Sequence, residues 1–280
     1  MNRLLRTELV RRLTSILFLS EIVGLLLYNY IEIALTTYGF EVDITYFLFD
    51  KTAILCICTA ANISLQLSQE LDNRTVNNKL FCGFRKSTFY KSEVLVGMIE
   101  GMLLLLADTA SLILFGKFQA YDMDLLHMRF FINLIITLAI ISSVAVISTV
   151  LSMLINHRIL SIFLVMGITL LLLYSGKETV RNLNQPAQTT LFSNDGNMHD
   201  NPLYIEGFQR AMHNAHLLAS PYAQSYYTYQ FLQEEQAEKA DNSLILKKIP
   251  YHIEFVLFDA IECSLLFIMG LYLFLKRNLQ

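Results

Sequence analysis

The chain has 280 residues, of which 54% are hydrophobic and 16% are charged, and its mean hydropathy is +0.46. Soluble domains carry roughly a quarter charged residues, so this composition excludes an ordinary soluble enzyme and places the chain among membrane proteins. The formal net charge of −3 provides no basic excess, so nucleic acid is excluded as a partner.

Residues 1–12 combine Leu and Val with four arginines. This mixture is typical of an amphipathic helix that lies on an anionic inner leaflet, with membrane lipid as its partner. The alternative is that the arginines serve only as topology signals.

Six apolar segments follow that are long enough to cross a bilayer, since a span needs about 20 mostly apolar residues. We therefore predict an all-α membrane protein with six transmembrane helices, of which the first five lie within residues 13–175. The predicted spans are residues 13–35, 46–67, 94–115, 130–155, 159–174 and 253–275.

Basic residues in short loops set the orientation, because Lys and Arg are retained on the cytoplasmic side. With the N-terminus inside, twelve Lys and Arg residues lie in cytoplasmic segments and three lie in the short outer segments. Both termini are predicted to be cytoplasmic, with residues 253–280 forming the last span and a cytoplasmic tail.

The cytoplasmic loop at 68–93 contains a short amphipathic helix. Val76, Leu80 and Phe84 recur every four residues, with Phe81 beside them, so one apolar stripe lies on a polar helix. Such a stripe predicts a partner groove, and Gly83 followed by basic residues predicts a helix stop.

These residues carry a resemblance to a known family. The loop resembles the one between the second and third spans of ABC-2 permeases, the membrane subunits of type-2 ABC transporters, whose usual pattern is E-x-x-x-G-T-I-R-N-K-L followed by a Gly, a basic pair region and Y-x-S/A-K. This chain has Arg74 where Gly is common and Asn77 where Arg is common. The matching residues are Glu70, Thr75, Val76, Asn78, Lys79, Leu80, Gly83, Arg85, Tyr90 and Ser92.

The resemblance implies a permease that dimerises with an identical or homologous permease and is driven by two copies of a separate ABC ATP-binding subunit. ATP and Mg²⁺ would be bound by that subunit, and this chain would be no enzyme, because it lacks the P-loop pattern G-x-x-x-x-G-K-[ST]. The alternative is a solvated juxtamembrane loop. The residues that the resemblance implies for coupling are Glu70, Thr75, Asn78, Lys79, Gly83 and Arg85.

Residues 176–252 are predicted to form an extracellular segment. Its first part, 182–200, has the composition of a loop, and helices are predicted at 204–218 and 222–240 with Pro221 as the break. Its run Asn201-Pro202-Leu203-Tyr204-Ile205-x-Gly207-x-x-Arg210, followed by Pro221-x-x-Gln224, is similar to the outer segment of bacterial ABC-2 permeases from peptide-antibiotic and bacteriocin export or immunity clusters. This resemblance implies a bacterial cell membrane. The segment would gate or contact a substrate, or equally would cover the pore mouth.

Charged groups within the membrane are costly, so those that persist usually face protein or water. Five carboxylates fall within predicted spans, and we expect no Lys or Arg at matching depth. These carboxylates could serve either in a substrate pathway or gate, or in hydrogen bonds between helices. They are Glu21, Glu100, Asp108, Asp259 and Glu262.

Two smaller features are ambiguous. Gly97 and Gly101 form a G-x-x-x-G motif, which is typical either of a dimer contact or of close packing within the chain. His213 and His216 share a predicted helix face, but no acidic residue completes a ligand set, so we predict no metal site.

We therefore predict the permease subunit of an ATP-driven ABC exporter that moves an amphipathic peptide, an antibiotic or a lipid-like molecule out of the cell. Two alternatives belong to other classes. One is a membrane sensor or assembly subunit without transport, and the other is an ion-coupled transporter that uses the buried carboxylates.

Overall fold

The computed structural model describes residues 2–36, 51–118, 128–155, 157–189, 199–228 and 252–277. Within them lie six helices that are long and apolar enough to cross a membrane, which confirms the predicted fold class of a multi-pass, all-α membrane protein. These helices are α2 (Ile16–Thr36), α4 (Thr52–Asp72), α6 (Lys86–Phe118), α7 (Met128–Leu154), α8 (Arg158–Leu183) and α11 (His252–Lys276).

Shorter elements join the spans. Helix α1 (Asn2–Leu13) precedes the first span, and α5 (Thr75–Phe81) lies between α4 and α6. Strands β1 (Gln188–Thr189) and β2 (His199–Asp200) pair antiparallel, α9 (Gly207–Ala219) follows them, and residues 221–228 are helical.

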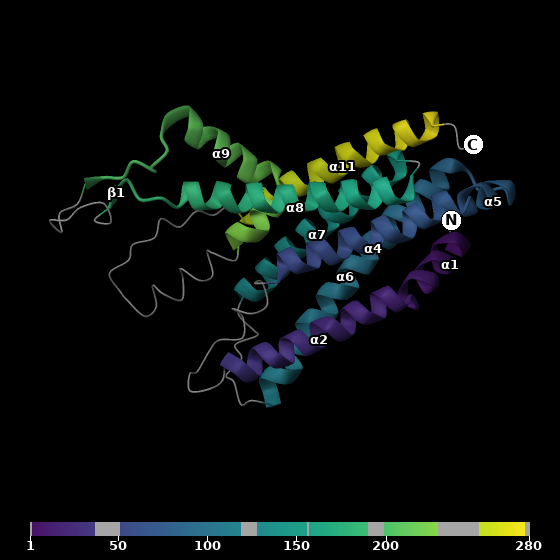
Figure 1. Cartoon of the computed structure of the whole chain (residues 1–280), viewed down its shortest axis with the longest axis horizontal. Helices are drawn as coiled ribbons and strands as arrows, with labels where there is room; N and C mark the ends of the chain where they lie inside the picture. The colour runs from purple at the N-terminus through teal and green to yellow at the C-terminus, as the bar shows by residue number, and fades with distance from the viewer. Residues whose placement is uncertain are drawn as a thin grey trace.

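Helix α7 is the centre of the bundle, because it packs against α4, α6, α8 and α11 (Figure 1). Helix α2 packs mainly along α6, at one edge of the molecule. At one end lie α1, α5 and the last turn of α11, and we call it the α5 end. The opposite end, which carries β1, β2 and α9, is the α9 end.

The helices extend further than the apolar segments that predicted them. Helix α6 begins at Lys86 rather than at 94, and α4 continues to Asp72, so the connection predicted at 68–93 is shorter. Helix α8 continues past 174 to Leu183, which makes the first residues of the predicted extracellular segment helical. Several residues of these extensions, such as Glu70, Phe89 and Val180, are buried against neighbouring elements of the protein.

The predicted break at Pro221 is present, since α9 ends at Ala219 and the next helix follows. That helix, residues 221–228, is buried in the bundle, with Tyr222 and Ala223 fully enclosed by residues of α4, α7, α8 and α11. Part of the segment predicted to be extracellular is therefore inserted between the spans. The remainder of the helix predicted at 222–240 lies outside the described residues.

Gly176 makes this insertion possible. A Cβ at this position would lie 2.7 Å from the Ala223 Cα and 2.8 Å from the Ala223 backbone nitrogen. Only a residue without a side chain allows the backbones of α8 and helix 221–228 to approach this closely.

Candidate functional site at the α5 end

Four charged side chains from three helices meet at the α5 end. Lys79 on α5 lies 2.6 Å from carboxylate oxygens of both Glu8 on α1 and Glu70 on α4. Arg11 pairs with the same two carboxylates, at 2.6 Å from Glu8. Both glutamates are almost fully buried, so each carboxylate is compensated by two cations, as buried charges require.

A second ion cluster lies beside the first and is more deeply buried. Arg12 is fully enclosed and pairs with Glu93 and, at 3.2 Å, with Glu100, both on α6. Burial alone lowers the pKa of Arg12, but the two carboxylates outweigh it and raise that pKa above its usual value. Arg12 therefore remains charged and ties α1 to the third span.

Carboxylate oxygens of Glu8, Glu70 and Glu93 lie within 4.8 Å of one another, which is close enough for a shared cation. Arg11, Arg12 and Lys79 already supply positive charge to these three groups. The arrangement is an ionic network between helices, and a metal ion is not needed to explain it.

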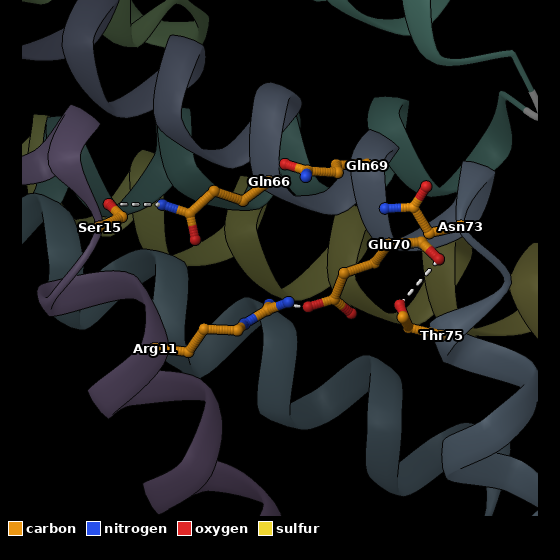
Figure 2. Close-up of a pocket in the computed structure, with 7 residues that line it drawn as sticks. All are labelled: Arg11, Ser15, Gln66, Gln69, Glu70, Asn73 and Thr75. Atoms are coloured by element: carbon orange, nitrogen blue, oxygen red, sulfur yellow. Dashed lines mark hydrogen bonds and ion pairs between the residues drawn. The ribbon is translucent and has the colours of Figure 1, made fainter.

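A small pocket of about 250 Å³ opens beside this network (Figure 2). Arg11 points across it toward Glu70, and the Thr75 hydroxyl donates to the Glu70 backbone carbonyl at 2.9 Å. The Gln66 amide donates to the Ser15 hydroxyl at 3.5 Å, at the other side of the pocket. The pocket wall thus joins α1 to α4 through polar contacts.

Both ends of α5 are set by backbone geometry. Arg74 precedes the helix with a φ of 56°, a left-handed conformation that glycine adopts most readily. Gly83 has a φ of 91° and ends the helix as predicted, with the Gly83 N–H donating to Leu80 O and the Phe84 N–H to Lys79 O. This is the Schellman pattern, which fixes the angle at which the chain leaves α5.

The apolar stripe of α5 packs within its own chain. Val76 is buried, and Leu80 and Phe84 pack against a cluster that includes Leu67 and Phe89. The prediction of a partner groove for this stripe is therefore corrected, because α4 and α6 form the groove. Phe81 lies off the stripe and is 88% exposed.

The structure divides the six predicted coupling residues into two groups. Glu70, Thr75 and Lys79 point inward and hold α5 onto α1 and α4. Asn78, Gly83 and Arg85 lie on the exposed side, where Arg74, Phe81 and Cys82 are also exposed. We call the exposed group, with Phe81 at its centre, the α5 surface.

Three of the intramembrane carboxylates bond other helices. Glu21 accepts from the Asn62 amide, Asp108 accepts from the Asn29 amide at 2.9 Å, and Glu100 pairs with Arg12. The expectation that no basic residue lies at matching depth is wrong for Glu100, because α1 inserts Arg12 among the spans. Interhelical bonding is the role that these contacts support for the three groups.

Asp259 and Glu262, on α11, differ from the other three. Asp259 is 1% exposed, and within the described residues neither of its carboxylate oxygens has a hydrogen bond of normal geometry. Glu262 lies one turn along the same helix and is half-buried. These two remain candidates for a role other than structural bonding.

Gly97 and Gly101 pack inside the chain. A Cβ on Gly97 would lie 2.8 Å from Ile63 of α4, and one on Gly101 would lie 2.5 Å from Ile141 of α7. Both glycines are buried between these helices, so close packing within the chain explains the motif and a second chain has no access to it here.

At the α9 end, His213 and His216 converge on one hydroxyl. The Thr179 Oγ1 lies 2.7 Å from the His216 Nδ1 and 3.5 Å from the His213 Nδ1. Burial, together with the neighbouring His213, lowers the pKa of His216. The pair therefore fastens α9 to α8.

Sequence reasoning did not assign Glu8, Arg12 or Glu93 to a site, and it placed Phe81 in the apolar stripe. Glu93 and Glu100 are seven residues apart on one helix, and this spacing places both on one face, which is a signal for a shared partner. No local pattern indicates that the partner is Arg12.

In comparisons with known proteins, no family model and no curated protein matches this chain.

Proposed function

We propose that this chain is the permease subunit of an ATP-driven exporter of the ABC-2 type. It pairs with a second permease, identical or homologous, and two copies of a separate ATP-binding subunit dock at the α5 end and bind the ATP and Mg²⁺. The α5 surface carries the proposal, because it presents an exposed aromatic residue on a helix whose other face is fixed to the spans.

Energetic reasoning favours the α5 surface as a docking site. A large aromatic side chain that is 88% exposed to water stabilises nothing within its own chain. Aromatic and Arg residues dominate protein interfaces when a partner buries them, and Phe81 is flanked by exposed Arg74 and Arg85. A partner with an apolar pocket rimmed by carboxylates would fit this surface.

Arg74 also supports the resemblance. The family pattern has a glycine at this position, and Arg74 adopts the left-handed conformation that glycine prefers. The departure from the pattern is thus a change of side chain at a position where the backbone still has the geometry of glycine.

The charge distribution supports the proposed orientation. The segments at the α5 end contain the twelve Lys and Arg residues that favour the cytoplasmic side, which is where an ATPase must dock. Cys82 tests this directly, because it is the exposed one of the four cysteines. We expect a membrane-impermeant thiol reagent to label Cys82 in inside-out vesicles and not in intact cells.

The substrate class is proposed from the outer-segment similarity. An amphipathic peptide, such as a bacteriocin, is the first candidate, and a lipid-like or antibiotic molecule is the second. Export out of a bacterial cell fits both.

The deciding experiment is purification of the tagged chain from its native membrane, with identification of the co-purifying proteins and an ATPase assay. We expect a stoichiometric P-loop ATPase. Phe81→Ala and Arg85→Glu should each weaken its association at least about tenfold, as an interface residue of this kind does. Phe208→Ala is the matched control, since Phe208 is 79% exposed at the opposite end.

Lys79 is a poor choice for this test. Lys79→Glu would place a third carboxylate between Glu8 and Glu70 and would disturb the fold itself. Association that survives both Phe81→Ala and Arg85→Glu would refute the α5 surface. Absence of any ATPase would favour a sensor or an ion-coupled transporter.

A further inference from the structure

A buried polar pair joins helix 221–228 to the last span. Asp259 of α11 is 1% exposed, and Gln224 of helix 221–228 is fully buried. Their side chains lie beside each other. The pair lies in the region where the segment after α9 inserts between the spans, next to Tyr222 and Phe255.

The pair has more acceptors than donors. Both carboxylate oxygens of Asp259 and the Oε1 of Gln224 are buried, and none of them has a hydrogen bond of normal geometry among the described residues. One of the two N–H groups of Gln224 Nε2 donates to the Leu218 backbone carbonyl at 3.0 Å, so only the other can serve Asp259. At least two of the three acceptors then stay unsatisfied, which is a costly arrangement for a native protein.

The surrounding groups do not supply the missing positive charge. The titratable groups that interact with Asp259 within the described residues are Glu262 and Cys263 on α11 and Cys56 on α4. All three are acids. An ionised Asp259 would therefore be an uncompensated charge inside the bundle, whereas the buried carboxylate of Glu100 is paired with Arg12.

We propose that Asp259 is a proton-binding site, and that its bound proton, donated in a hydrogen bond to Gln224, holds helix 221–228 against α11. The bound proton removes the buried charge and supplies a donor to the unsatisfied Oε1 of Gln224. Loss of the proton leaves that oxygen without a donor and leaves an uncompensated carboxylate buried between the two helices, which favours their separation. The inserted helix is thus released as pH rises, and re-docks as pH falls. This inference does not depend on an ATPase partner.

Infrared difference spectroscopy of the full chain in lipid nanodiscs tests the proton. We expect the carbonyl stretch of a protonated carboxyl at neutral pH, lost in Asp259→Asn and retained in the control Glu262→Gln. Asn has the shape of a protonated Asp, and its amide can donate to Gln224. A spectrum in which Asp259→Asn removes no protonated-carboxyl band would overturn the proposal.

A single tryptophan tests the latch. The chain has no Trp, so Tyr227→Trp introduces one reporter on helix 221–228, where Tyr227 packs edge-on against Phe255 at 5.7 Å. We expect its emission to shift on raising the pH, in step with loss of the infrared band, and to stay constant in Asp259→Asn. A shift that persists in Asp259→Asn would refute the latch.

Two further measurements keep the proposal testable if a variant fails or if the site binds another cation. Should Asp259→Asn not fold, the pH titration of the Tyr227→Trp chain alone decides, since loss of the band without a simultaneous emission shift contradicts the coupling. Raising NaCl or KCl at constant pH should leave the band unchanged. A band that disappears with salt would assign the site to a monovalent cation instead of a proton.

Discussion

Replacing Gly176 with alanine tests whether helix 221–228 is docked as the structure has it. The Cβ would lie 2.7 Å from the Ala223 Cα, whereas ordinary contacts begin at 3.4 Å, so helix 221–228 must retreat by about 0.7 Å. Because the obstructing atoms belong to the backbone, no side-chain rotation relieves the clash. Gly167, in the same helix, has nothing within 4 Å and supplies the matched control.

The expected change in the free energy of unfolding follows from two opposing contributions. Glycine to alanine within a helix gains up to about 1 kcal/mol of helix propensity, and both variants share this gain. Overpacking a well-filled core costs about 1–3 kcal/mol, and only Gly176→Ala incurs it. The difference between the two variants should therefore be about 1–3 kcal/mol, with Gly176→Ala the less stable.

Hydrogen exchange of the 221–228 backbone amides in lipid nanodiscs measures this difference locally. We expect exchange in Gly176→Ala to be faster than in Gly167→Ala by roughly fivefold to 150-fold, which is the same free energy expressed as a rate ratio. Equal exchange in the two variants would show that α8 and helix 221–228 do not touch at Gly176, and the insertion would have to be abandoned.

Three other predictions concern the helix ends and the ionic network. Arg74→Gly should raise the thermal stability by about 1 kcal/mol in a melting experiment, because it relieves a left-handed residue, and a loss of stability would contradict that backbone assignment. Arg12→Met should lower the free energy of unfolding by about 3 kcal/mol or more, because it leaves two buried carboxylates unpaired. Arg11→Met should change the free energy of unfolding by about 1 kcal/mol or less, because Arg11 is 44% exposed. Equal melting temperatures for the two variants would argue against the buried pairs. Burial lowers the pKa of His216, so the contribution of this residue to stability is present above the ordinary histidine pKa of about 6.5 and is lost as pH falls below that value. Hydrogen exchange in α9, corrected for intrinsic rates, should therefore accelerate on acidification. This acceleration should vanish in His216→Gln.

The number and type of the spans could be predicted because apolar length is a local property of the sequence. Their ends could not, since a helix that leaves the membrane continues wherever another element packs on it. Helix α8 illustrates this, because Thr179 and Val180 lie past the apolar segment and are buried by neighbouring elements. Composition therefore predicts which residues lie in the lipid, whereas contacts with other elements determine where the helix ends.

Some residues of the candidate site, Glu70, Thr75 and Lys79, could be named from the sequence, but the directions in which their side chains point could not be predicted. Lys79 is a basic residue in a polar loop, which favours a surface position, yet it is bonded to Glu8 and Glu70. Glu8 lies 71 positions earlier in the chain, so no local periodicity links the two. Phe81 was assigned to the apolar stripe, but the stripe is satisfied within the chain and Phe81 is the residue left outside it.

The ionic network determines how a force on α5 would travel. Lys79 connects α5 to α1 and α4 through two buried carboxylates, and Arg12 connects α1 to the third span through two more. Separating any of these charges within the bundle leaves one of them uncompensated, which costs several kcal/mol, whereas moving them together costs nothing electrostatically. A partner that displaces α5 must therefore carry α1 and the adjoining ends of α4 and α6 with it. The α5 surface is thus joined to the spans through buried ion pairs, and a partner that displaced α5 would move these parts of the spans while the ion pairs stayed intact.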